Sequence, residues 1–152
     1  MKLARVGATA AAIVAAATVA WAQKTDFSGT WTLDPASAPA AAPAGDALGS
    51  GPATVKQTAD TLTIERTMAG GPVTLTYKLD GTDSRNMLMS EGGQQADSLS
   101  TAKWDGPKLT IVTKQEADGR LTESTQVWTV QGSTLTVETT TARGRQKRVY
   151  RK

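Results

Sequence analysis

Short segments of the chain alternate apolar and polar residues. The alternation is clearest in residues 61–65, 73–79 and 134–138, where the Leu, Ile, Val and Tyr positions share one parity. Successive side chains of a strand point to opposite faces, so each segment predicts a strand with one apolar and one polar face. The same pattern, or a high content of Thr and Val, predicts strands over residues 25–33, 53–58, 61–67, 73–79, 98–104, 108–115, 121–130, 133–141 and 146–151.

Turn-forming pairs separate these segments. Asp80-Gly81, Asp105-Gly106, Asp118-Gly119 and Gln131-Gly132 provide the positive-φ positions that tight hairpins need, and Gly70-Gly71 and Ala59-Asp60 serve similarly. Neighbouring strands should therefore pair antiparallel. Residues 82–96 are less regular and predict one short or irregular strand.

The predicted fold is all-β, an antiparallel up-and-down barrel of 8 to 10 strands. An open meander of this length would leave two unpaired edges, whereas a closed barrel removes them. A β-sandwich is the alternative. A barrel of about eight or more strands can hold one small ligand, so the expected architecture itself suggests binding.

The first 22 residues have the form of a signal peptide. Lys2 and Arg5 precede an apolar run that ends at Ala20, and Ala20-Trp21-Ala22 is a small-x-small cleavage site. We expect the mature chain to begin at Gln23, with residues 23–152 as one domain. With no cysteine to carry a lipid, the cleaved product should be secreted or periplasmic, without stable membrane insertion; an uncleaved leader acting as a tether is the alternative.

A Pro/Ala-rich segment at about residues 34–52 interrupts the strands. Prolines at 35, 39, 43 and 52 rule out a regular ladder and would break a long helix. The segment predicts a surface loop that is either a functional lid or partly disordered.

Charge does not favour nucleic acid as a partner. The whole chain carries 17 basic and 14 acidic residues, but removal of the leader leaves 15 and 14, a net charge of +1. Six of the 15 lie in residues 143–152, which contain no acid. We interpret this basic end as the solvated outer face of a strand, with a patch for anionic lipid, polysaccharide or nucleic acid as the alternative.

The composition argues against an enzyme. Without His or Cys the chain cannot form a Ser-His-Asp or Cys-His arrangement, nor the usual zinc and haem sites. Asp80, Asp83, Glu116 and Asp118 fall in predicted turns, where carboxylates cap the backbone. Residues 80–86 lack the spacing of a calcium loop. We therefore expect no catalytic residues, no metal and no cofactor.

The two ends of the mature chain resemble the calycins, the superfamily of lipocalins and fatty-acid-binding proteins. Residues 27–33, Phe-Ser-Gly-Thr-Trp-Thr-Leu, resemble the first-strand F-x-G-x-W signature, and Arg148-Val149-Tyr150 looks like the R-x-Y ending of the fatty-acid-binding branch. The Trp104-Asp105-Gly106 turn and Val149-Tyr150 also resemble small secreted lipocalin-like proteins of bacteria. The Pro-rich loop departs from the helical lid of the fatty-acid-binding proteins.

This resemblance implies two alternative roles for Arg148. It could hold a ligand carboxylate together with Tyr150, or it could pack across Trp31 and close the barrel, as a late Arg does in lipocalins. Trp31, Tyr77, Trp104 and Trp128 are the further large side chains that could line or fill a cavity. Arg66 shares a face with Leu62 and Ile64, so it either enters the barrel or sits at its rim. The rim is expected, because an unpaired buried charge is costly.

Together these features predict an exported, monomeric, lipocalin-like protein that binds a small apolar or carboxylate-bearing molecule. The alternative is a pocketless envelope protein that interacts through its basic C-terminal strand or its Pro-rich loop. Sequence cannot distinguish them, because the difference is the volume of the barrel interior.

Overall fold

The computed structural model describes residues 24–90 and 93–152. The expected signal peptide and the cleavage site before Gln23 lie outside these residues. Among the residues described, no helix is long and apolar enough to cross a membrane. They contain one 3-10 turn, η1 (Pro35–Ser37), and the strands β1 (Gly29–Leu33), β2 (Ala53–Gln57), β3 (Thr61–Met68), β4 (Gly71–Lys78), β5 (Asp83–Met89), β6 (Gln95–Asp105), β7 (Lys108–Ala117), β8 (Arg120–Gln131), β9 (Thr134–Thr141) and β10 (Gly144–Arg151).

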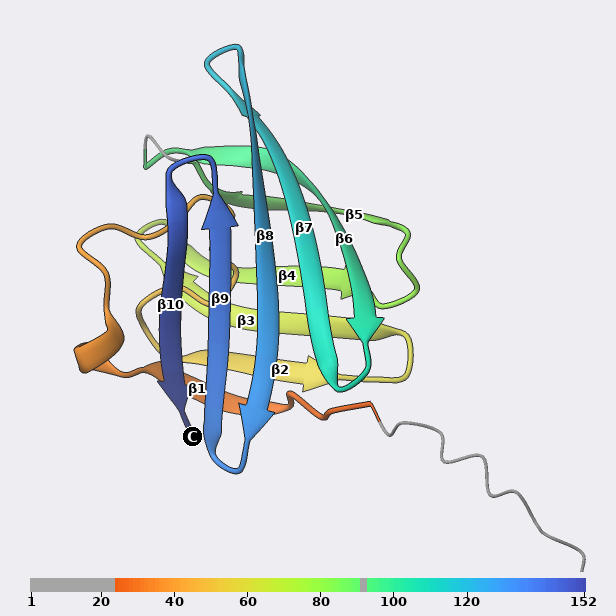
Figure 1. The fold of residues 1–152 in the computed structure, drawn as a ribbon. Helices are drawn as coiled ribbons and strands as arrows, with labels where there is room; N and C mark the ends of the chain where they lie inside the picture. The colour runs from red at the N-terminus through yellow and green to blue at the C-terminus, as the bar shows by residue number, and fades with distance from the viewer. Residues whose placement is uncertain (1–23, 91–92) are drawn as a thin grey trace, which may run out of the picture.

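The strands form one antiparallel, up-and-down sheet that curls into a nearly closed barrel. The order is β4-β3-β2-β1-β10-β9-β8-β7-β6-β5, so the first strand joins the last. β1 pairs with β2 through Trp31 and Ala53, and with β10 through Leu33 and Tyr150. Figure 1 shows β2, β3 and β4 crossing behind β7 to β10. The predicted barrel is confirmed, and the fold is not the alternative sandwich.

The hairpins follow the turn signals of the sequence. Gly106 and Gly132, with φ of 58° and 59°, adopt the left-handed conformation that their turns require. Residues 82–96, expected to hold an irregular strand, contain the regular β5 and the start of β6. The alternation of apolar and polar residues did not reveal β5, because two of its inward-facing residues, Ser84 and Asn86, are polar.

These polar side chains close the barrel at the seam between β4 and β5. The Asn86 side chain accepts from the Thr76 N–H at 2.9 Å and donates to the Thr76 carbonyl at 3.0 Å. Ser84 Oγ accepts from the Lys78 N–H at 2.8 Å. An amide carries the same donor and acceptor as a peptide group, so Asn86 supplies to β4 what a neighbouring strand backbone would supply.

Aromatic residues fill one end of the interior. The Phe27 ring stacks on Trp104 with centroids 5.9 Å apart and meets the edge of Trp128 at 5.7 Å. The indole N–H of Trp31 donates to the Phe27 carbonyl at 2.8 Å. Phe27, Trp31 and Trp128 are fully buried. The segment before β1 therefore completes the apolar core at this end of the barrel.

Candidate functional site

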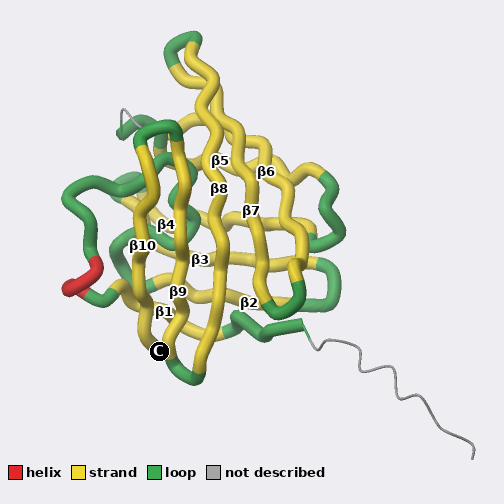
Figure 2. Tube along the Cα trace, in the orientation of Figure 1, coloured by secondary structure: helices red, strands yellow, loops and turns green. Residues whose placement is uncertain are grey.

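The Pro/Ala-rich connection between β1 and β2 enters the barrel. Figure 2 shows it leaving the strands at η1 and returning behind β10. Residues 43–48 are all buried, and Ala47 and Leu48 are each 1% exposed. The expectation of a surface loop is wrong for this part. Its mostly small side chains fit inside the barrel, and wall side chains hydrogen-bond its carbonyl groups. We call residues 43–49 the plug.

At the centre of the plug, the Asp46 carboxylate forms an ion pair with the Arg148 guanidinium. Arg148 Nη1 donates to Asp46 Oδ2, and both side chains are almost entirely buried. The second carboxylate oxygen accepts from the Gly49 N–H at 3.2 Å. A charge-assisted hydrogen bond between two desolvated groups is stronger than the same contact at the surface. Asp46 therefore anchors the plug to β10.

Arg148 and Tyr150 share the inner face of β10, as their i, i+2 spacing predicts. The Tyr150 hydroxyl donates to the Gly49 carbonyl at 3.2 Å. The Arg148 guanidinium also lies 5.8 Å from the centroid of the Tyr150 ring. The two residues that the calycin resemblance selected therefore lie side by side, and both donate hydrogen bonds to the plug.

A second arginine also points into the interior. Arg66 is 9% exposed, and its Nη2 donates to the Asp46 carbonyl at 3.1 Å. The expectation that Arg66 stays at the rim is wrong, because the plug backbone provides an acceptor inside. Asp46, Arg66 and Arg148 are the charged residues buried in the described part of the chain. We call Arg66, Arg148 and Tyr150 the anion seat.

Further polar side chains line the interior on β6, β7, β8 and β9. Gln126 Nε2 donates to the Gly45 carbonyl at 2.8 Å, while its oxygen accepts from the Trp128 indole at 3.1 Å. Gln115 donates to the Leu88 carbonyl at 3.2 Å. The buried polar residues of this wall are Ser98, Ser100, Thr113, Gln115, Ser124, Gln126 and Thr139. The interior thus has an aromatic end and a polar end.

Several donors of the polar end have no acceptor in the described structure. The Nε atoms of Arg66 and Arg148 and the Tyr77 hydroxyl are buried without a hydrogen-bond partner. Burial raises the pKa of both Tyr77 and Tyr150, and the nearby Asp46 carboxylate adds to the increase while Arg66 opposes it. Both phenols remain neutral and can donate.

The predicted tryptophans lie apart from the anion seat. Trp31, Trp104 and Trp128 all contact Phe27 at the aromatic end. The cation over the Trp31 ring is Lys152, whose Nζ lies 4.8 Å from the centroid. The alternative that Arg148 packs across Trp31 is therefore wrong, because Asp46 holds that guanidinium inside the barrel.

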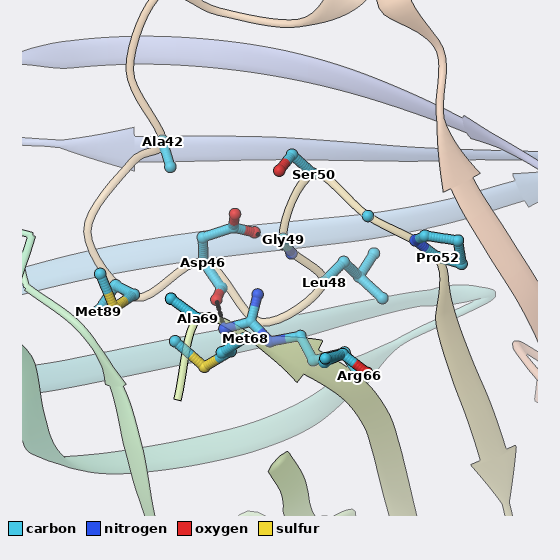
Figure 3. A pocket seen from close by; sticks show the side chains of 12 residues that line it. Ala42, Asp46, Leu48, Gly49, Ser50, Pro52, Arg66, Met68, Ala69 and Met89 are labelled. Carbon is cyan, nitrogen blue, oxygen red and sulfur yellow. Dashed lines mark hydrogen bonds between the residues drawn. The ribbon is translucent and has the colours of Figure 1, made fainter. Parts of the chain in front are cut away.

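A cavity of about 260 Å³ lies beside the plug. Figure 3 shows Asp46, Leu48 and Gly49 on one side of it and Arg66 with Met68 on the other. Met89, at the end of β5, also lines the cavity. This cavity gives access to the plug and to Arg66.

Sequence reasoning missed Asp46 and Gln126. Asp46 carries the one charge between Pro35 and Pro52, a signal that the sequence contained. Gln126 lies on a strand whose two faces both carry polar residues, so alternation could not place it. Local structure places neither residue in the site. Closure of the barrel does so, and it joins Gln126 to Gly45, the neighbour of Asp46, across 81 residues of sequence.

The barrel is similar to several solved structures. A mutant of the fluorescent protein UnaG superposes with a TM-score of 0.57 at 21% identity, covering 83% of this chain and 95% of that one. Human cRBP IV gives 0.55 at 20%, covering 84% and 98%. Secretory abundant heat soluble protein 4 from Ramazzottius varieornatus gives 0.53 at 21%, covering 86% and 98%.

At these identities the similarity establishes the fold, which is the calycin-like barrel that the two terminal motifs indicated. No protein-family model and no curated protein sequence matches the chain. Any function must therefore be argued from the anion seat itself.

Proposed function

We propose that this protein is an exported, calycin-like carrier or receptor that binds a small carboxylate-bearing molecule inside the barrel, without catalysis. The observation that carries the proposal is the buried Arg148, whose guanidinium holds a carboxylate beside the Tyr150 hydroxyl. A guanidinium and a phenol in a desolvated interior favour a carboxylate over a neutral group.

The two ends of the interior suit an amphipathic ligand. The anion seat would take the carboxylate, and the aliphatic and aromatic residues of the core would contact the apolar part. Tyr77 could contact either part of such a ligand, since its apolar ring is buried and its hydroxyl lacks a hydrogen-bond partner among the described residues. Secretion or a periplasmic location is part of the proposal and rests on the leader sequence.

The test is a titration with a dansyl-labelled medium-chain fatty acid and with its methyl ester, which lacks the charge. Wild type should bind the acid and not the ester, and Arg148→Gln should weaken acid binding by about 30-fold or more, because a buried anion would lose its charged partner. Arg151→Gln is the matched control, since Arg151 is exposed and pairs with Asp34. The proposal would be contradicted if wild type bound the ester as tightly as the acid, or if Arg148→Gln bound the acid as tightly as wild type does.

A second candidate is the pocketless interaction protein. It is favoured by the plug, whose buried residues 43–48 occupy the interior. In this case neither probe binds, and native mass spectrometry of protein purified from its own host shows the mass of the bare chain. Arg145 and Lys147, on the exposed face of β10, would then be the first residues to mutate.

A further inference from the structure

We infer that the plug is a displaceable occupant of the ligand site, with Asp46 in the position of a ligand carboxylate, and that the ligand is a small anion bearing further hydrogen-bond acceptors. This inference rests on the proposed function and specifies both the ligand class and its control. The barrel interior around the anion seat would alternate between a state filled by the plug and a state filled by the ligand.

The first argument is the direction of the hydrogen bonds. Four wall side chains donate to the plug: Arg148 to the Asp46 carboxylate, and Arg66, Gln126 and Tyr150 to backbone carbonyls. The plug thus presents the wall with one carboxylate and three carbonyl oxygens. A molecule that replaces it must satisfy the same donors, because a buried donor without a partner is costly.

The second argument is charge. Two guanidinium groups contact Asp46, Arg148 at its carboxylate and Arg66 at its backbone carbonyl, and both have an Nε atom without a partner in the described residues. The seat can therefore accept more negative charge and more acceptors than the plug provides. A ligand with a carboxylate and a second acidic or carbonyl group fits this surplus better than a simple fatty acid does.

The third argument is how weakly the rest of the plug is held. Its buried apolar side chains are Ala44, Ala47 and Leu48, together with the Pro43 ring, and two of these are single methyl groups. Its backbone N–H of Gly45 makes a long contact of 3.4 Å to the Met89 carbonyl. Apart from Ala47 and Leu48, which pack in the apolar core, the specific attachment is polar, and a competing anion can take over those polar contacts. The cavity of about 260 Å³ at Arg66 gives that anion a point of entry.

Two variants release the plug by different physical routes. Asp46→Asn removes its charge. Gly45→Ala keeps every charge but adds a Cβ at φ 73°, where it would meet Ser124 Oγ at 2.5 Å. The matched controls are Asp34→Asn, whose ion pair with Arg151 is on the surface, and Gly106→Ala, which has the same backbone strain at φ 58° and no atom within 4 Å.

The probes are dansyl-glutamate, with two carboxylates, and dansyl-leucine, with one. If the plug-free state is a minor population of about 1 to 10%, both Asp46→Asn and Gly45→Ala should bind dansyl-glutamate about 10- to 100-fold more tightly than wild type. The two controls should bind as wild type does. Dansyl-glutamate should bind more tightly than dansyl-leucine, and Arg66→Gln should remove that preference.

Hydrogen exchange of wild type provides a readout that needs no variant. Saturating dansyl-glutamate should increase deuterium uptake in residues 43–49 while β7 to β10 stay protected. If binding depends on Arg148 but the plug stays protected and neither variant binds more tightly, displacement is wrong and the proposed function stands. If no carboxylate probe, including the dansyl fatty acid, binds any folded variant, the proposed function is wrong and the displacement falls with it.

Discussion

Asp46 and Arg148, 102 residues apart in the sequence, form an ion pair inside the barrel. Each side chain is less than a tenth exposed. The Coulomb attraction of such a pair competes with the cost of removing both charges from water, so the pair adds little net stability. Loss of one partner, however, leaves the other charge buried alone.

A double-mutant cycle should show this coupling. Arg148→Gln and Asp46→Asn should each lower the free energy of unfolding, Asp46→Asn by no more than about 3 kcal/mol because the plug-free state limits the loss, and the double variant should lose clearly less than the sum. Urea unfolding followed by tryptophan fluorescence measures all four proteins. Additive losses would mean that the two groups do not interact in solution.

Trp31 should be a principal contributor to stability. Its side chain is fully buried and its indole N–H donates to the Phe27 carbonyl. Trp31→Ala should therefore cost about 3 to 5 kcal/mol, the usual range for a buried large aromatic. Lys152→Gln, which removes only the cation over the ring, should cost less than about 1 kcal/mol. A loss below about 1 kcal/mol for Trp31→Ala would show that the indole is not a core residue.

The seam between β4 and β5 should depend on one amide. Asn86→Ala leaves the Thr76 N–H and carbonyl without their partners and should cost about 1 to 3 kcal/mol. Hydrogen exchange at the Thr76 amide should accelerate specifically. Arg85→Ala, on the exposed face of the same strand, should leave that amide unchanged. Faster exchange in both variants would assign the effect to β5 as a whole.

Alkaline titration should reveal both tyrosines of the chain as buried. Burial raises the pKa of Tyr77 and Tyr150 above the ordinary value of 10.0, because the ionised phenol is poorly solvated. The folded state therefore binds these protons more tightly, and their stabilising effect is complete below pH 10.0 and lost as the pH rises beyond it. The tyrosinate absorbance should appear together with the loss of tryptophan circular dichroism. A tyrosinate signal that develops in the folded protein near pH 10.0 would contradict this burial.

At low pH the carboxylates that cap turns should be one contributor to the loss of stability. Hydrogen bonds from the side chain and backbone of Ser28 to Asp26, and of Thr82 to Asp80, hold the pKa of each carboxyl below its usual 3.8. Their contribution is present above pH 3.8 and is lost as the pH falls through the lowered pKa. The chain has no His, so the free energy of unfolding should be nearly flat from about pH 5 to 8. Asp80→Asn should make the acid decline shallower in urea unfolding measured from pH 2 to 5; an unchanged slope would exclude Asp80 as a contributor.

Much of the barrel could be read from local features. Alternation located the strands with strong apolar faces, such as 73–79, and the Asp-Gly pairs located the hairpins, because both signals depend on residues within a few positions of each other. The inward pair Arg148 and Tyr150 also followed from strand parity alone. The sequence failed at β5, where Asn86 and Ser84 face inward to serve the seam.

The anion seat, by contrast, was decided by tertiary structure. Sequence determined that Arg148 and Tyr150 share a strand face and that a proline-rich loop follows β1. It did not determine that the loop turns inward, that its Asp46 neutralises Arg148, or that Arg66 can be buried because a plug carbonyl accepts from it. Burying a charge depends on a partner brought from a distant part of the chain, and only closure of the barrel provides that partner.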